Sequence, residues 1–110
     1  MNRINTDKQY RIVSMKHTLK NDRFITLWGP NDAGYHWSKE MSGIYEGYVP
    51  GYHESERNMP ITEEFANILF KPVNYEGKEK HMILNTISNT NKLGLKWVKG
   101  KLVKESSLPK

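Results

Sequence analysis

The chain has 110 residues, of which 36% are hydrophobic and 26% are charged, and its formal net charge is +5 at pH 7. This length fits a single domain over residues 1–110, in which we expect residues 1–8 and 104–110 to be flexible tails. The absence of cysteine excludes a disulfide scaffold and thiolate metal sites, and the absence of a long apolar run excludes a membrane-spanning helix. Because the first residues are polar, we expect no secretory signal and a cytoplasmic location.

Charge is distributed unevenly along the chain. Residues 1–23 have a net charge of +4, residues 24–70 of -5 and residues 71–110 of +6. If the two basic flanks meet in space, they form a basic patch beside an acidic centre. The alternative is two separate lysine-rich faces that keep a small domain soluble.

The first half of the chain predicts short strands. Residues 9–18 and 24–28 are rich in β-branched and aromatic residues, and a polar turn between them favours a hairpin. In the first of these segments both alternating sets of side chains contain apolar residues, so the buried face is ambiguous. Residues 29–34 are almost all turn formers and are followed by a short strand at 35–37.

The second half predicts two helices and more strands. Residues 43–52 contain three glycines and a proline and are expected to be irregular, and residues 53–59 are expected to be a polar loop. A helix is predicted at 62–70 with Thr62 as its N-cap, and a second helix at 86–93. A strand is expected at 81–84, and a terminal hairpin is expected where 95–98 and 101–103 flank Lys99-Gly100. The fold class is therefore α+β, a small antiparallel sheet of four to six short strands with one or two short helices.

The spacing of histidines and carboxylates in this sequence gives little indication of catalysis. The four histidines are too far apart in the chain to form a local metal pair, and we predict no metal site, no cofactor and no catalytic residue. One acid–base alternative remains open, in which His36 or His53 acts with a nearby carboxylate. The carboxylates considered for it are Glu40, Glu46 and Glu54.

Aromatic residues and glycines are concentrated between residues 24 and 52. This segment holds seven of the twelve aromatic residues and five of the eight glycines. Flat rings on a glycine-rich backbone favour binding of a flat ligand, and a base stacked on a ring contributes about 1–3 kcal/mol. The same rings can instead form the core, which we favour for Phe24, Trp28 and Trp37, whereas the tyrosines at 45, 48 and 52 are expected to be partly exposed. The candidate ligand-binding residues are Trp28, Asn31, Tyr35, Trp37, Tyr45 and Tyr52.

The segments Thr26–Tyr35 and Gly43–Tyr45 resemble a signature of small proteins encoded by phages and prophages. In that group T-x-W-x-P-x-x-x-G-Y is followed by G-x-Y, and an arginine often occupies the position of Gly29. The resemblance brings no known activity and no catalytic residues. It implies an accessory protein that acts in a bacterial host cell, where such proteins often counter bacterial defence by binding.

Two functions of different classes follow. The first is a non-catalytic counter-defence protein that sequesters a nucleotide-like immune signal or blocks a host defence protein, with assembly into a homo-oligomer left open. The second is a nucleic-acid-binding module in which the basic flanks contact phosphates and the aromatic residues stack on bases. The acidic centre disfavours the second function because its carboxylates repel phosphate. No membrane partner is expected.

Overall fold

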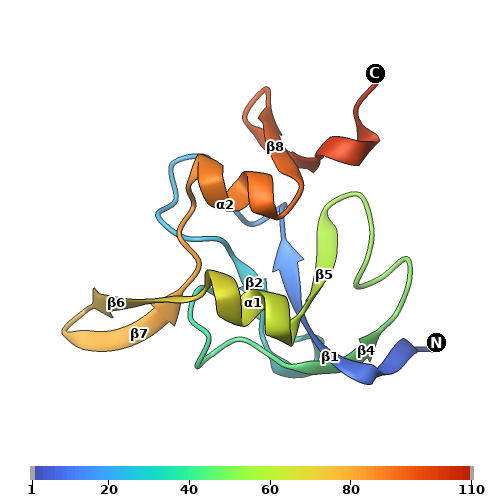
Figure 1. Cartoon of the computed structure of the whole chain (residues 1–110), viewed down its shortest axis with the longest axis horizontal. Helices are drawn as coiled ribbons and strands as arrows, with labels where there is room; N and C mark the ends of the chain where they lie inside the picture. The colour runs from blue at the N-terminus through green and yellow to red at the C-terminus, as the bar shows by residue number, and fades with distance from the viewer. Residues whose placement is uncertain (1, 110) are drawn as a thin grey trace.

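The computed structural model describes residues 2–109, and these form nine strands and two α-helices (Figure 1). This arrangement confirms the α+β class. In chain order the elements are β1 (Ile4–Ser14), β2 (Leu27–Trp28), the 3-10 turn η1 (Pro30–Asp32), β3 (Tyr35–His36), β4 (Tyr45–Tyr48), β5 (Asn58–Thr62), α1 (Glu63–Leu69), β6 (Lys71–Tyr75), β7 (Lys78–Met82), α2 (Ile87–Lys92), β8 (Leu95–Val98), β9 (Lys101–Lys104) and the 3-10 turn η2 (Glu105–Ser107).

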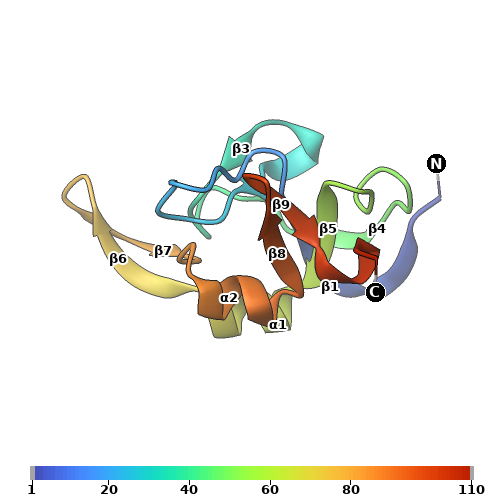
Figure 2. The same ribbon diagram turned by 90° about the horizontal axis from the view of Figure 1, so that it is seen from above.

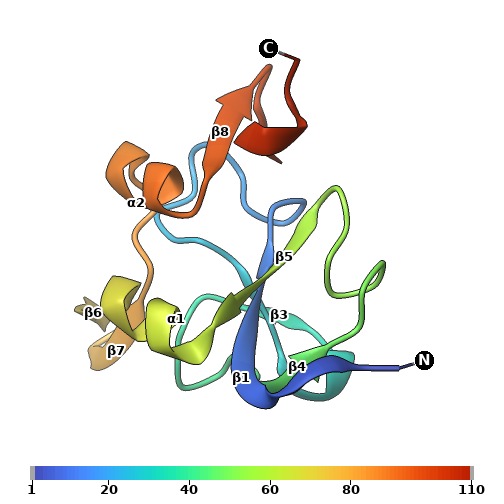
Figure 3. The same ribbon diagram turned by 45° about the vertical axis from the view of Figure 1, so that its right-hand side comes forward.

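Strand β1 organises a five-stranded antiparallel sheet. Tyr10 pairs with Tyr45 of β4 on one edge and with Thr62 of β5 on the other. Further along, Val13 pairs with Leu27 of β2, and β2 in turn pairs with β3. Figure 3 shows β5 running beside β1 toward α1. β1 therefore joins segments that lie far apart in the sequence.

Both faces of β1 are buried over its last five residues, which explains why its sequence pattern is ambiguous. On one face Val13 packs in the main core, with residues of α1, β8 and β9. On the other face Ile12 packs with Trp28 and Tyr45 in a second, smaller cluster. A strand covered on both faces shows no clear alternation of polar and apolar side chains.

The helices and the terminal hairpin agree closely with the sequence predictions. The Oγ1 atoms of Thr62 and Thr86 accept hydrogen bonds from the third backbone N–H of α1 and α2, at 3.1 Å in each case. The β8–β9 hairpin turns at Lys99-Gly100, where both residues have positive φ, as a tight two-residue turn requires. The β6–β7 hairpin projects from the body of the molecule (Figure 2).

Several predicted boundaries differ from the structure. Ile4–Lys8 belong to β1 although we expected residues 1–8 to be a tail, and the expected tail at 104–110 includes η2. Residues 43–52 were expected to be irregular, yet they contain β4, and β5 begins inside the expected loop at 53–59. Pairing with β1 determines the backbone of β4 and β5, whereas local propensity favoured a loop. Residues 1 and 110 lie outside the described residues.

None of the helices in residues 2–109 has the length and apolar character needed to cross a membrane.

Candidate functional site

The two signature segments of the sequence pack against each other as one unit. The N–H of Gly43 donates to the carbonyl of Trp28 at 2.9 Å, and a Cβ atom on Gly43 would lie 2.7 Å from Cα of Pro30. The hydroxyl of Tyr45 donates to the carbonyl of Gly29 and accepts from the N–H of Asp32 at 2.9 Å. The T-x-W-x-P and G-x-Y motifs are therefore linked, since backbone and side-chain hydrogen bonds join the second motif to the backbone of the first and of the turn that follows it.

The structure gives a reason for glycine at position 29. A Cβ atom at this position would lie 2.1 Å from the carbonyl oxygen of Ala33. The N–H of Gly29 also donates to the carbonyl of Gly34 at 2.7 Å, closing the loop around η1. A side chain at residue 29 would force this loop open.

His53 lies fully buried beneath the same loop. Its Nδ1 accepts the N–H of Val49 at 2.9 Å, so Nε2 carries the proton and donates to Oδ1 of Asp32 at 2.8 Å. Asp32 and its neighbour Asn31 both have positive φ, which asparagine and aspartate tolerate better than most residues. His53 thus fixes the conformation of η1 from below.

Four of the six predicted ligand-binding residues join this unit through their rings. The ring of Trp28 lies edge-to-face with Tyr52 at 5.2 Å and with Tyr35 at 6.4 Å between centroids. Tyr45 packs against His53 at 5.0 Å, and His53 packs against Trp28 at 5.3 Å. Because the rings meet edge-to-face or tilted, they leave no parallel slot in which a base would be sandwiched.

Exposure differs from the prediction for Tyr45 and for Trp37, which was expected in the core but is half-buried. Trp28 is buried as expected, and Tyr52 is 38% exposed. Tyr45 was expected to be partly exposed but is only 4% exposed, because its hydroxyl bonds hold it under η1. Tyr35 is 48% exposed although His17 stacks on it at 3.8 Å, so its other face is open to solvent.

A pocket of about 360 Å³ opens beside this unit. Its wall includes Asn31 and Tyr45, which were predicted, and Arg3, whose guanidinium lies 5.9 Å from the centre of the Tyr45 ring. The side chains of Arg3, Asn31 and Glu46 form no hydrogen bond or ion pair with another described residue. The remaining wall residues are Thr6, Pro30 and the half-exposed Ile44.

Trp37 is not brought to this pocket. Its Nε1 donates to Oγ1 of Thr26 at 3.0 Å, and its ring packs edge-on against Phe24 at 5.4 Å and Tyr75 at 6.2 Å. It borders a separate hollow of about 190 Å³ near β7. Of the six predicted residues, only Asn31 and Tyr45 line the pocket. Trp28, Tyr35 and Tyr52 belong to the aromatic cluster next to Tyr45 without lining the pocket, and Trp37 lies in a second cluster.

The acid–base alternative receives little geometric support in the form that uses His53. His53 is buried with both nitrogens engaged, so it has no open position toward a substrate. Glu40 is engaged with His81, which donates its backbone N–H at 3.1 Å and bonds through Nδ1 at 2.7 Å. Across residues 2–109 no three histidines or carboxylates gather in a way that could hold a metal ion.

Burial affects the ionisation of Tyr45 in the pocket wall and of Tyr48 in β4. Removal of the Tyr45 phenol from water raises its pKa, which the hydrogen bond from the Asp32 N–H only partly offsets. Burial likewise raises the pKa of Tyr48, and the carboxylate of Glu54 adds to the effect. Both phenols are therefore neutral hydrogen-bonding groups at physiological pH.

A larger hollow than this pocket lies elsewhere. It is an open groove of about 830 Å³ between the first half of β1, β4 and α1, and carboxylates outnumber the single cation of Lys8 along it. These carboxylates are Asp7, Glu46, Glu63 and Glu64. Such a surface repels anions, so the smaller pocket with Arg3 is the better candidate for an anionic ligand.

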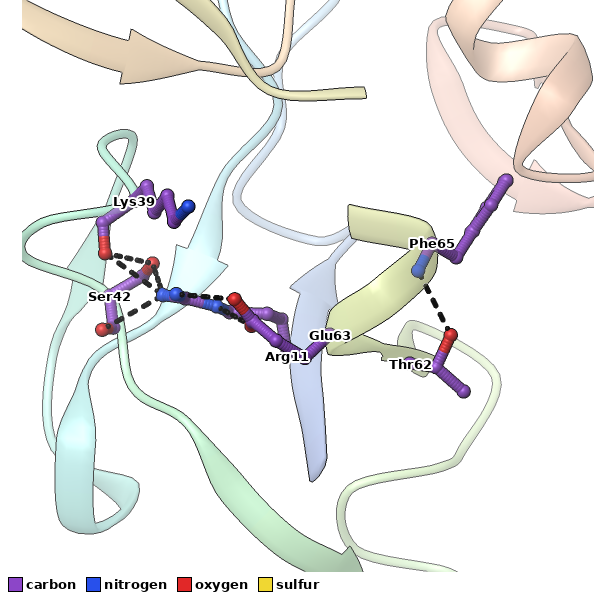
Figure 4. Close-up of polar contacts among 6 residues, drawn as sticks. All are labelled: Arg11, Lys39, Ser42, Thr62, Glu63 and Phe65. Atoms are coloured by element: carbon purple, nitrogen blue, oxygen red, sulfur yellow. Dashed lines mark hydrogen bonds and ion pairs between the residues drawn. The ribbon is translucent and has the colours of Figure 1, made fainter. Parts of the chain in front are cut away.

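Arg11 forms a second buried polar centre, which sequence reasoning missed (Figure 4). It is 2% exposed and forms a two-point ion pair with Glu63 at the start of α1. Its Nη1 also donates to the carbonyl of Lys39 at 2.9 Å and to Oγ of Ser42 at 2.7 Å. Each of its nitrogens is thus satisfied, and the residue acts as a structural bridge between β1, α1 and the 38–42 turn.

Some of the missed residues carried little signal in the sequence. Arg3 and Arg11 lie in or beside a strand segment rich in polar residues, where arginine is usually solvated. His53 was named from the sequence only as an acid–base candidate, whereas its structural role beneath η1 depends on contact with the distant Asp32.

Comparison with known proteins found no matching family model, no matching curated protein and no matching solved structure.

Proposed function

We propose that this protein is a non-catalytic accessory protein of the phage type that counters host defence by sequestering a nucleotide-like signal. The observation that carries the proposal is the pocket beside η1, where Arg3, Asn31 and Glu46 present polar groups with no partner among the described residues. The pocket volume of about 360 Å³ falls in the range of small-molecule sites.

The chemistry of the wall fits a planar anionic ligand. The guanidinium of Arg3 can pair with a phosphate, and Pro30 with Ile44 offers apolar surface to a base or a sugar. The amide of Asn31 and the carboxylate of Glu46 supply a donor and acceptors for polar edges. Tyr45, held by two hydrogen bonds, gives the pocket a rigid floor.

Native mass spectrometry of the protein purified from a bacterial lysate is the first test. We expect a bound mass in the nucleotide range that is lost on denaturation, and the same spectrum reports the oligomeric state. Titration calorimetry with adenosine and guanosine mono-, di- and cyclic nucleotides then identifies the class. Absence of both a retained mass and a binding heat contradicts the proposal.

A matched pair of variants locates the site. Arg3→Gln is expected to weaken nucleotide binding about tenfold or more, because a charge-assisted hydrogen bond contributes about 1.5–3 kcal/mol. Lys8→Gln, close by in β1, removes the same charge but does not line this pocket, and it is expected to bind as the parent protein does. Equal weakening by both variants would mean that net charge, and not the pocket, attracts the ligand.

A second candidate is blockade of a host defence protein through the exposed aromatic surface. It is favoured by the half-exposed rings of Tyr35 and Tyr52, which rest on the buried Trp28. Tyrosines of this kind are common at protein-binding hot spots. Tyr35→Ala/Tyr52→Ala would then abolish capture of a host protein while nucleotide binding is unchanged, and capture equal to the parent would reject this candidate.

A further inference from the structure

The terminal hairpin β8–β9 carries a dense group of cations. Residues 95–104 contain four lysines and no carboxylate, whereas the β6–β7 hairpin mixes its lysines with glutamates. No lysine of residues 2–109 forms an ion pair with another described residue. The ammonium groups of β8–β9 are therefore available to an external anion.

The pairing of the two strands sorts their side chains by face. Leu95 pairs with Lys104 and Trp97 with Leu102, and the apolar members of this set pack into the main core. The other face presents two lysines and two valines, and its lysines are diagonal neighbours, about 7–8 Å apart at the backbone. The residues of this outward face are Lys96, Val98, Lys101 and Val103.

We propose that the outward face of β8–β9 binds the phosphate backbone of double-stranded DNA without reading its sequence. A two-stranded ribbon fits the major groove of DNA, and the two lysines of the face together with Lys99 at the turn can each neutralise a phosphate. The face has no arginine, asparagine or glutamine, which are the residues that most often contact base edges with two hydrogen bonds. It has no aromatic residue for stacking on unpaired bases either.

This surface is separate from the proposed nucleotide pocket. The β8–β9 hairpin lies at the opposite end of the molecule from β4 and the first residues of β1 in Figures 1 and 3. Binding of DNA at this hairpin therefore goes beyond the proposed function, and the two can be tested separately. It also differs from a nucleic-acid module that depends on aromatic stacking, because the outward face of β8–β9 carries no aromatic residue.

Fluorescence anisotropy with a labelled duplex of about 20 base pairs tests the proposal between about 50 and 200 mM salt, a range that resolves counterion release. Three phosphate contacts predict a slope of about -2 to -3 in log K against log salt. Duplexes of different sequence are expected to bind equally, and more tightly than the single strand. Absence of binding at the lowest salt, or a preference for the single strand, overturns the proposal.

Matched double variants assign the binding to the hairpin. Lys96→Gln/Lys101→Gln is expected to reduce the size of the slope by about two and to weaken binding several-fold. Lys71→Gln/Lys78→Gln makes the same change in charge on β6–β7 and is expected to leave the slope unchanged. Equal effects of the two pairs would overturn the proposal, because net charge alone would then explain binding.

A vesicle control distinguishes binding to DNA from binding to an anionic membrane surface. Vesicles of phosphatidylserine and phosphatidylcholine are expected to bind weakly, since the face offers only half-buried valines to insert into a bilayer. Tight vesicle binding that the Lys96→Gln/Lys101→Gln change removes, together with no duplex binding, would assign the face to membranes and reject the proposal. Circular dichroism of each variant verifies that it remains folded.

Discussion

At the scale of single residues, Tyr45 and His53 show how a small domain gives fixed shape to a surface loop. Each occupies a buried position and directs its polar atoms to the loop around η1, through the Gly29 carbonyl, the Asp32 N–H and the Asp32 carboxylate. An unpaired buried donor or acceptor costs about 1–3 kcal/mol, so these hydrogen bonds specify one loop conformation.

The raised pKa of Tyr45 and Tyr48 leads to a prediction about alkaline pH. Because burial favours the neutral phenols, their contribution to stability is complete below the ordinary pKa of 10.0 and is lost as pH rises through the folded-state pKa. We expect tyrosinate absorbance to reveal phenols that ionise at a higher pH than exposed tyrosines do. Thermal stability is expected to fall as the pH rises through the folded-state pKa of these phenols. In Tyr45→Phe one of these phenols should disappear, and an unchanged titration would contradict the assignment.

At the scale of elements, local signals and long-range pairing account for different parts of the fold. Thr62, Thr86 and Lys99-Gly100 define caps and a turn through contacts within a few residues, so the sequence predicts them well. β4 could not be found in this way, because its glycine-containing sequence becomes a strand only when it pairs with β1. The candidate site divides in the same way. The aromatic block can be recognised in the sequence, whereas the position of Arg3 beside the pocket depends on the pairing of β1 with β4.

One of the contacts that join the β6–β7 hairpin to the body depends on pH. Glu40 accepts the backbone N–H of His81 in β7 and bonds to its ring, and Ser38 forms a β-bridge with Met82. Partial burial alone would raise the pKa of Glu40, but the hydrogen bonds from His81 outweigh it and the net pKa is lowered.

The sign of this shift predicts weaker attachment of the hairpin in acid. The contribution of Glu40 is present above its ordinary pKa of 4.5 and is lost as pH falls through the lowered folded-state pKa. Protection of the β7 amides against hydrogen exchange should decrease in that acidic range relative to protection in β1. Glu40→Gln should show the lower protection already at neutral pH, and equal protection in the two proteins would argue against this role.

At the scale of the whole molecule, Arg11 connects parts of the chain that are distant in sequence. Its ion pair with Glu63 joins β1 to α1, and its bonds to Lys39 and Ser42 hold the turn after β3 (Figure 4). The ring of Phe70 lies 5.4 Å from the guanidinium carbon. Removing one member of such a buried ion pair is expected to destabilise the fold far more than replacing both members with apolar residues.

A double-mutant cycle measures this bridge. Arg11→Met is expected to lower the free energy of unfolding by about 3–5 kcal/mol, because Glu63 is left without its partner. Arg11→Met/Glu63→Met should recover part of that loss, which urea denaturation can quantify. Additive effects of the two single changes would show that the ion pair contributes no coupling.

The central position of β1 also affects the order in which the molecule folds. Tyr10 must find Tyr45 and Thr62 across long stretches of chain, whereas β8 and β9 close over only Lys99-Gly100. Closing long loops before their contacts form slows folding, so the lysine ribbon is expected to form early and the β1–β4 pairing late. The pocket beside η1 depends on that late pairing, so in a refolding chain the lysine-rich β8–β9 hairpin would form before the pocket does.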